Sequence, residues 1–414
     1  MKLIITSAIA FFLFTNVNAQ IISTFAGTNE YRFHGDDVIA TNAYLYEPNG
    51  VAVDDAGNIY IADILNNRIR KVTASTGKIS TIAGNGTYGS SGDGGLAINA
   101  ILSGPVDLTV DKFGNIYFAD NDHNCVRKID GSTGIINTIA GTNGTAGFTG
   151  DGGLAINALL YWPRFVKIDR NGNLFISDNG NNRIRKIGTN TGLISTVVGN
   201  GNTPPFVNGM GFASSTGDGG LAIDAPIVNP WFISIDSHGD IYFSELGCHT
   251  VRKVDMRTGI INTIVGTGIE GYSGDGGIAV NAQLEYPGGL AIDQFDNLYI
   301  SDVGNYRIRK VDKLTGYINT YVGDGAAGYW GDGGQALNSK ISTPQGLCTD
   351  VNGNLFIAET AYRSIRKVNS ATGIITTVAG VSIFDTNGGL ATKAQLSGPS
   401  VLKFNSKGDL FSFY

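Results

Sequence analysis

A unit of four short β-favouring runs recurs along this chain at a nearly fixed period, and no other feature constrains the fold as strongly. The first full copy has its runs at 51–53, 59–62, 68–72 and 79–83. The segments between them, 55–58 and 75–78, contain the glycine and asparagine that tight hairpins need. One small four-stranded sheet cannot bury both of its faces alone, so it must stack on copies of itself.

The period can be followed through the acidic residue that closes the second run of each unit. It recurs as Asp63, Asp120, Asp178, Glu245, Asp302 and Glu359, with spacings of 57, 58, 67, 57 and 57 residues. A repeated four-strand unit without a long helical pattern is typical of a β-propeller. The sequence therefore predicts an all-β propeller of four-stranded antiparallel blades at about 48–84, 105–141, 163–199, 230–266, 287–323 and 344–380.

The two ends of the chain contain parts of one more unit. Residues 21–27 match a fourth run, while 399–404 and 408–412 match a first and a second run. We expect one domain spanning 20–414, with six complete blades and a partial seventh formed by 399–414 together with 21–27. We favour a truncated C-terminus, because an open second strand would leave an unpaired edge. A ring of six blades is the alternative to a ring of seven.

Residues 1–19 have the features of a secretory signal peptide. Met1-Lys2 precedes an apolar run at 3–14, and the small-residue end at 17–19 offers a cleavage site before Gln20. The apolar run is too short to span a membrane, which takes about 20 residues. We therefore expect a secreted, extracellular protein without a membrane span, or a periplasmic or cell-surface one in a bacterium.

The composition argues against several kinds of partner. Charged residues make up 15% of the chain and the net charge is −6. The protein as a whole therefore has no electrostatic attraction for nucleic acid or for an anionic membrane. The three cysteines, Cys125, Cys248 and Cys348, lie in different units, which indicates buried free thiols and no disulfide framework. We expect a monomer that does not bind nucleic acid.

A second repeated module lies between the blades. Its clearest copy, Gly92–Ala100, reads Gly-Asp-Gly-Gly-Leu-Ala-Ile-Asn-Ala, and Ala97, Ala100 and Leu102 are spaced for one helical turn on a blade edge. Glycines with positive φ and a capping aspartate suit such a turn. We expect structural, capping roles for Asp93, Asp151, Asp218, Asp275 and Asp332. No cofactor is expected; a structural calcium ion held by these loops is the alternative.

Strand direction places the modules on one face of the disc. With alternating strands, the modules and the second-to-third connections share a face, which we call the module face. The other two kinds of connection lie on the opposite side, which we call the turn face.

Acid–arginine pairs and basic pairs recur in the blades. An acid and an arginine flank the second-to-third turn in alternate blades, as Asp63/Arg68, Asp178/Arg183 and Asp302/Arg307. Because the pair recurs by blade, we expect a structural bond that ties the hairpin together rather than a ligand site. Every third run also carries a basic pair, first Arg70-Lys71, whose members lie on opposite sides of the strand. We expect inter-blade ion pairs and apolar edges covered by the long side chains.

These motifs resemble the NHL repeat. The combination Gly-Val-Ala-Val-Asp, Gly-Asn-Ile-Tyr-Ile-Ala-Asp and Asn-Arg-Ile-Arg-Lys-Val, with Gly-Asp-Gly-Gly-Leu-Ala between units, is similar to the long form found in teneurin NHL domains and secreted bacterial proteins. The resemblance covers essentially all of 21–414. It implies a propeller that serves as a recognition platform, although a few relatives are lyases or lactonase-like enzymes.

One connection breaks the period, and the break suggests a binding site. The connection before the fourth unit is longer by ten residues and carries Pro204, Pro205, Phe206, Met210 and Phe212. Three tryptophans, Trp162, Trp231 and Trp330, occur near the same kind of connection. We hypothesise that these residues contact a partner, and that deleting 204–212 leaves folding intact and abolishes binding. An inert insertion that folds over its own blade is the alternative.

The best-supported function is a secreted, non-enzymatic platform for protein or glycan binding, or for adhesion. The runner-up is a lactonase-like hydrolase or lyase with a divalent metal on the propeller axis. The four histidines, His34, His123, His238 and His249, occupy different positions in the unit, which argues against a zinc site. No metal ligand and no catalytic residue is therefore predicted. A fragment of a longer cell-surface protein is a third reading.

Overall fold

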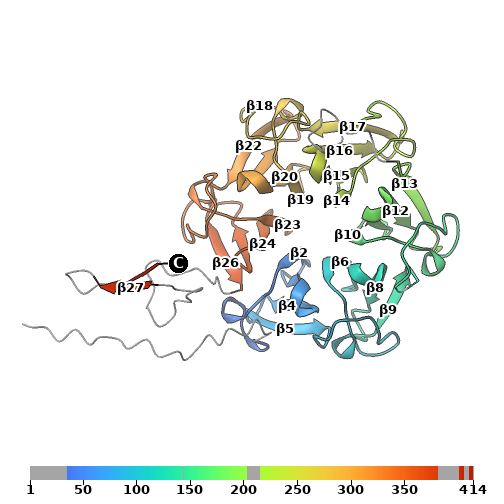
Figure 1. The fold of residues 1–414 in the computed structure, drawn as a ribbon, viewed down its shortest axis with the longest axis horizontal. Coiled ribbons are helices and arrows are strands. Elements are labelled where there is room, and N and C mark those ends of the chain that lie inside the picture. Colours follow the sequence, from blue (N-terminus) through green and yellow to red (C-terminus); the bar gives the residue numbers. More distant parts are fainter. Residues whose placement is uncertain (1–34, 143, 203–214, 381–400, 405–409, 414) are drawn as a thin grey trace, which may run out of the picture. The chain divides into compact units, whose positions relative to one another are not determined.

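The computed structural model describes residues 35–142, 144–202, 215–380, 401–404 and 410–413. The chain divides into two compact units, one spanning 31–383 and the other combining 1–30 with 384–414. In the first unit six β-sheets stand around a common axis (Figure 1). Among the described residues no helix is long and apolar enough to cross a membrane.

Each blade is an antiparallel sheet whose four strands follow one another in sequence. The strands are, in blade 1, β2 (Pro48–Val53), β3 (Ile59–Asp63), β4 (Arg68–Thr73) and β5 (Lys78–Ala83); in blade 2, β6 (Pro105–Val110), β7 (Ile116–Asp120), β8 (Cys125–Ile129) and β9 (Ile136–Ala140); in blade 3, β10 (Pro163–Ile168), β11 (Leu174–Asp178), β12 (Arg183–Ile187) and β13 (Ile194–Val198); in blade 4, β14 (Pro230–Ile235), β15 (Ile241–Glu245), β16 (Thr250–Asp255) and β17 (Ile260–Val265); in blade 5, β19 (Pro287–Ile292), β20 (Leu298–Asp302), β21 (Arg307–Val311) and β22 (Tyr317–Val322); in blade 6, β23 (Pro344–Thr349), β24 (Leu355–Glu359), β25 (Ser364–Val368) and β26 (Ile375–Ala379).

Short elements connect these strands. Single 3-10 turns lie in the modules at η1 (Ala40–Asn42), η3 (Ala97–Asn99), η5 (Ala155–Asn157), η8 (Ala279–Asn281) and η10 (Ala336–Asn338). Others follow the second strands at η2 (Ile64–Asn66), η4 (Asn121–His123), η6 (Asn179–Asn181), η7 (Leu246–Cys248) and η9 (Val303–Asn305). The two-residue strands β1 (Val38–Ile39) and β18 (Gly277–Ile278) extend the outer edges of blades 1 and 5. Ala97, Ala100 and Leu102 are buried, as predicted.

The ring closes with six blades, and every junction uses the same bond. One alanine in each module accepts a hydrogen bond from the glycine that ends the preceding blade, and its own N–H donates to a glycine of the next blade. The alanines are Ala40, Ala97, Ala155, Ala222, Ala279 and Ala336. Between the last and the first blade, Gly380 N–H donates to Ala40 O at 2.9 Å. Blade 6 therefore meets blade 1 as every other pair of neighbours meets.

The partial seventh blade is not shown. The junction through Ala40 joins blades 1 and 6 directly. The predicted first and second strands at the C-terminus do form a hairpin, with β27 (Val401–Phe404) antiparallel to β28 (Leu410–Phe413). The predicted clasp strand at 21–27 lies outside the described residues.

Six buried arginines stabilise the blades from within. The first basic residue of each third-strand pair is fully buried, at Arg70, Arg127, Arg185, Arg252, Arg309 and Arg366. Each makes an ion pair with the acid that closes the second strand, at 3.2–3.7 Å, and with the aspartate of the preceding module, at 2.5–3.1 Å. The lysine that follows stands over a second-strand aromatic ring, 5.0–5.7 Å from its centroid.

The three predicted acid–arginine pairs differ from the observed ones. Asp178 lies opposite Arg183 in register, but its charge partner is Arg185, whereas Arg183 donates to the carbonyls of Asn181 and Asn200. The same exchange pairs Asp63 with Arg70 and Asp302 with Arg309.

The module aspartates also act on a neighbour rather than on their own turn. Asp93 makes no cap bond to η3; its carboxylate accepts from Arg127 at 2.6 Å and from Thr138 N–H at 3.0 Å. Asp151, Asp218, Asp275 and Asp332 bond in the same way to Arg185, Arg252, Arg309 and Arg366. Each of these acids therefore links its module to the next blade.

The three cysteines, Cys125, Cys248 and Cys348, are buried and free, as predicted.

Candidate functional site

The first strand of each blade lines the propeller axis and is irregular just after its proline. In blade 3 the register against β11 shifts between Pro163 and Val166, and the other five blades shift at the same place. Such bulges re-aim side chains. The second of the two bulged residues is Gly50, Asp107, Phe165, Phe232, Gly289 and Gly346 in blades 1 to 6.

Three glycines, two phenylalanines and Asp107 make up this ring of residues. A Cβ on Gly289 would lie 1.9 Å from the carbonyl oxygen of Gln345, so the first strands of blades 5 and 6 approach too closely for any side chain. On the other side of the axis Phe165 and Phe232 are 1% and 4% exposed, and their ring centroids are 3.7 Å apart. The two aromatic rings therefore occupy the room that the glycines leave.

A ring of strained residues surrounds the axis on the module face. The residue before the first-strand proline has a positive φ in all six blades, and only blade 2 uses glycine there. The others are Glu47, Trp162, Asn229, Tyr286 and Thr343, with φ between 40° and 53°. Left-handed backbone is unfavourable for bulky residues, so a ring of them is worth attention as a functional feature.

Side chains of the neighbouring blades fix this ring. Asn124 Oδ1 accepts from Trp162 N–H at 2.9 Å, and Asn182 Oδ1 accepts from Asn229 N–H at 2.9 Å. His249 Nδ1 accepts from Tyr286 N–H at 3.2 Å. Burial lowers the pKa of His249, which favours the neutral ring that this bond requires. The backbone is thus held at three positions of the ring. Glu47, Trp162 and Asn229 are exposed, whereas Tyr286 and Thr343 are half-buried.

Aromatic and arginine side chains gather at this end of the axis. The Trp162 ring is 49% exposed and stacks with Tyr161 at 4.8 Å. The Arg164 guanidinium lies 4.2 Å from the Trp231 ring centroid, and that of Arg363 lies 4.4 Å from the Tyr46 ring centroid. Tryptophan, tyrosine and arginine are the residues that most often dominate protein interfaces.

The structure separates the binding residues predicted from sequence. Trp162 and Trp231 lie beside the axis. Trp162 directly precedes β10, and Trp231 lies within β14. Trp330 lies on the module between blades 5 and 6, where it is 60% exposed and its backbone pairs with Lys340. Pro204, Pro205, Phe206, Met210 and Phe212 lie outside the described residues, so the effect of deleting 204–212 stays a prediction.

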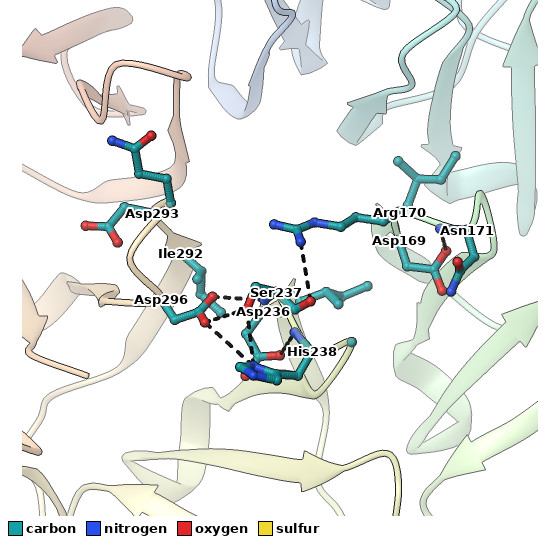
Figure 2. Close-up of a pocket in the computed structure, with 13 residues that line it drawn as sticks. Asp169, Arg170, Asn171, Asp236, Ser237, His238, Ile292, Asp293 and Asp296 are labelled. Atoms are coloured by element: carbon teal, nitrogen blue, oxygen red, sulfur yellow. Dashed lines mark hydrogen bonds and ion pairs between the residues drawn. The ribbon is translucent and has the colours of Figure 1, made fainter. Parts of the chain in front are cut away.

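A cavity opens at the axis on the turn face and was not predicted. It measures about 350 Å³ and is lined by the first-to-second turns of blades 3, 4 and 5, at 168–171, 235–239 and 292–296. Figure 2 shows Arg170 extending from blade 3 toward Ser237, and Asp296 of blade 5 reaching Ser237 and His238. A second cavity of about 210 Å³ along the first strands shares Ile168 and Ile292 with it.

The turns around this cavity depart from the repeat. Five blades place glycine at the fourth turn position, but blade 5 has Asp296 there, with φ 62°. Five blades end the turn with asparagine, but blade 4 has Asp240. Comparing the six turns position by position would have revealed both departures from the sequence alone.

No group of three or more histidine, cysteine, aspartate or glutamate side chains in the described part of the chain is arranged to hold a metal ion. His123 and His249 lie in second-to-third connections and His238 in a first-to-second turn. These three histidines therefore lie on opposite faces of the ring.

The architecture defines a six-bladed β-propeller assembled from one repeated unit. Residues 85–149 match the teneurin NHL domain, and residues 45–72 and 160–187 match the NHL repeat. The chain therefore contains NHL repeats and a segment similar to the teneurin NHL domain, as its motifs predict.

Relatives by sequence include teneurin-1 of Gallus gallus and NHL repeat-containing protein 2 of Bos taurus. Teneurin-1 is 30% identical over 302 residues, which is 65% of this chain and 11% of the teneurin. The Bos taurus protein is 26% identical over 368 residues, which is 86% of this chain and 43% of that protein. The chain thus spans about a tenth of the teneurin that it matches.

Two solved structures from Bacteroides thetaiotaomicron share the fold. One is a structural genomics protein of unknown function, with a TM-score of 0.58 and 18% identity, covering 81% of this chain and 72% of the other. The second is an auxiliary nutrient binding protein, with a TM-score of 0.55 and 14% identity, covering 84% and 75%.

Proposed function

We propose that this protein is a non-enzymatic binding platform that acts outside the cell or at its surface, and that its module face binds a protein partner around the axis. The observation that carries the proposal is the ring of non-glycine residues at positive φ, of which Glu47, Trp162 and Asn229 are exposed. Gly104 of blade 2 shows that glycine fits the position before the first-strand proline. The other five blades nevertheless have a residue with a side chain there. Apart from Asn229, each such residue costs about 1–3 kcal/mol in backbone strain, and strained residues of this kind are found preferentially at functional sites.

The chemistry of this ring suits a protein partner. Trp162 is half-exposed and its backbone is fixed by Asn124, so little backbone freedom is lost on binding. The Arg164 guanidinium over the Trp231 ring adds a preformed aromatic and cationic pair at the same end of the axis. The sequence similarity to teneurins supports a role at the cell surface, and the signal-like N-terminus agrees with it.

We expect Trp162→Ala to weaken binding about 30-fold, the effect of losing a central interface residue worth about 2 kcal/mol. The full chain would be screened against purified extracellular protein domains and, in parallel, a glycan array. Affinity of the best protein partner would then be measured by surface plasmon resonance. Trp330→Ala is the matched control, since it also removes an exposed tryptophan but at the outer module.

The comparison of the two variants decides the proposal. Equal thermal unfolding of both proteins establishes that folding is intact. If only Trp330→Ala weakened binding, the partner would contact the outer modules and the axial ring would not be the site. Capture of a glycan without any protein partner would also reject a protein-binding function.

A further inference from the structure

We propose that the cavity on the turn face is a second, independent binding site, which takes a small carboxylate-bearing ligand of monosaccharide size, such as a hexuronate. At about 350 Å³ it falls within the range of small-molecule sites. It lies at the opposite end of the axis from the module face, so this inference does not depend on the proposed protein partner.

The acids around the cavity are already engaged, and this argues against a cationic ligand. Asp236 accepts from two backbone N–H groups, the Tyr242 hydroxyl and Lys253. Asp293 accepts from two backbone N–H groups, the Asn297 amide and a tyrosine hydroxyl. Each of these carboxylates serves to hold its own turn.

The donors around the cavity are much less engaged. Arg170 donates one bond, to the carbonyl oxygen of Ser237 at 3.4 Å, although a guanidinium carries five N–H donors. Arg170 is exposed, and within the described part of the chain it forms no ion pair. His238 lies on the neighbouring turn with a side chain that is 70% exposed, and its Nδ1 is 3.7 Å from Asp296. A guanidinium with open donors on a cavity wall is suited to a carboxylate, which it binds through two parallel bonds.

A second cation lies deeper on the same strand. Lys167, three residues before Arg170, lines the smaller cavity, which meets the larger one at Ile168. Its ammonium group makes no ion pair with any described residue. Lys167 and Arg170 together place positive charge along one side of the axis in a chain whose net charge is −6.

Asp296 fixes the opposite wall of the cavity. Its carboxylate accepts from Ser237 N–H at 2.9 Å and from Ser237 Oγ at 2.7 Å, which joins the turns of blades 4 and 5. The residue adopts φ 62° at a position that is glycine in the other blades. A strained residue is retained here for a bond that shapes the cavity mouth.

Isothermal titration calorimetry with D-glucuronate and D-glucose tests the assignment on the full chain. We expect glucuronate to bind with a dissociation constant in the millimolar range or tighter and glucose not to bind. Arg170→Ala should weaken glucuronate binding at least tenfold. Arg170→Lys keeps the charge but cannot form the bidentate hydrogen bonds of a guanidinium, so it should weaken glucuronate binding by a smaller factor.

Lys112→Ala is the matched control, because Lys112 is an exposed cation at the same turn position in blade 2. Its affinity for glucuronate should equal that of the unmodified chain. The proposal is overturned if glucuronate does not bind, if Arg170→Ala binds it as well as the unmodified chain, or if Lys112→Ala loses binding equally. Equal affinity for inorganic phosphate would overturn the carboxylate assignment. Thermal unfolding of each variant verifies that the ring is intact.

Discussion

Replacing Arg185 with methionine should lower the free energy of unfolding by about 3–5 kcal/mol, the usual effect of removing one partner from a buried ion pair. The Arg185 side chain is fully buried between Asp178 at 3.4 Å and Asp151 at 2.7 Å. It also donates to the carbonyl oxygens of Leu159 and Thr149. Methionine fills part of the volume but leaves Asp178 buried without its cation.

Lys186→Met is the matched control for this variant. Lys186 is the next residue of β12, on the other side of the strand, where its ammonium stands 5.7 Å from the Phe175 ring centroid. Its loss should change the free energy of unfolding by less than about 1 kcal/mol. Urea unfolding of the three proteins, followed by tryptophan fluorescence, measures both effects. A loss below 1 kcal/mol for Arg185→Met would show that the ion pairs contribute specificity but little stability.

The blades could be predicted from the sequence because their determinants are local. Alternating apolar runs, glycine-containing turns and a closing acid recur in every unit, so each copy supports the interpretation of the others. The faces followed from strand direction alone. What the repeat could not decide was how the ring closes, since the first module at 35–43 is a degenerate copy. Ala40 of that module makes the closing bond, whereas the more conspicuous strand-like segments at the ends suggested a seventh blade.

The arginine that pairs with each second-strand acid could not be predicted from sequence spacing alone. Arg183 and Arg185 lie on the same side of β12, and both are near enough to Asp178 to bond with it. The choice between them depends on Asp151, which comes from the preceding module and adds a second carboxylate next to Arg185. That contact spans 34 residues in sequence and is formed only when module and blade are packed.

The turn-face cavity was missed for a different reason. Its residues lie in three separate turns, each of which appears ordinary by itself. The informative signals are single departures from the repeat, Asp296 for glycine and Asp240 for asparagine, which gain meaning only when the ring brings blades 4 and 5 together.

Asp107 is a further departure from the repeat, and it places a carboxyl group inside the ring of first strands. The residue is 8% exposed, and its Oδ2 accepts from Val166 N–H at 3.0 Å. A Cβ on Gly50 would lie 2.5 Å from Asp107 Oδ1, so the neighbouring strand needs glycine to accommodate the carboxyl group. Burial raises the pKa of Asp107 to about 7, although the Val166 N–H and the charge of Lys167 oppose the shift.

Asp107→Asn should therefore stabilise the propeller, and increasingly so as the pH rises. A carboxyl whose pKa is raised from 3.8 to about 7 by folding stabilises the fold most below pH 3.8, and that contribution is lost as the pH rises to about 7. Asparagine stays neutral and its amide oxygen can still accept from Val166 N–H. The gain in the free energy of unfolding should be small near pH 4 and approach about 4 kcal/mol at pH 8, at 1.36 kcal/mol per pKa unit. Urea unfolding of the variant and of the unmodified chain at both pH values measures the difference between their free energies of unfolding. The contributions of the other buried acids are the same in both proteins and cancel in that difference. A constant difference between the two pH values would mean that Asp107 does not titrate in this range and that its ionised form is stabilised by Lys167.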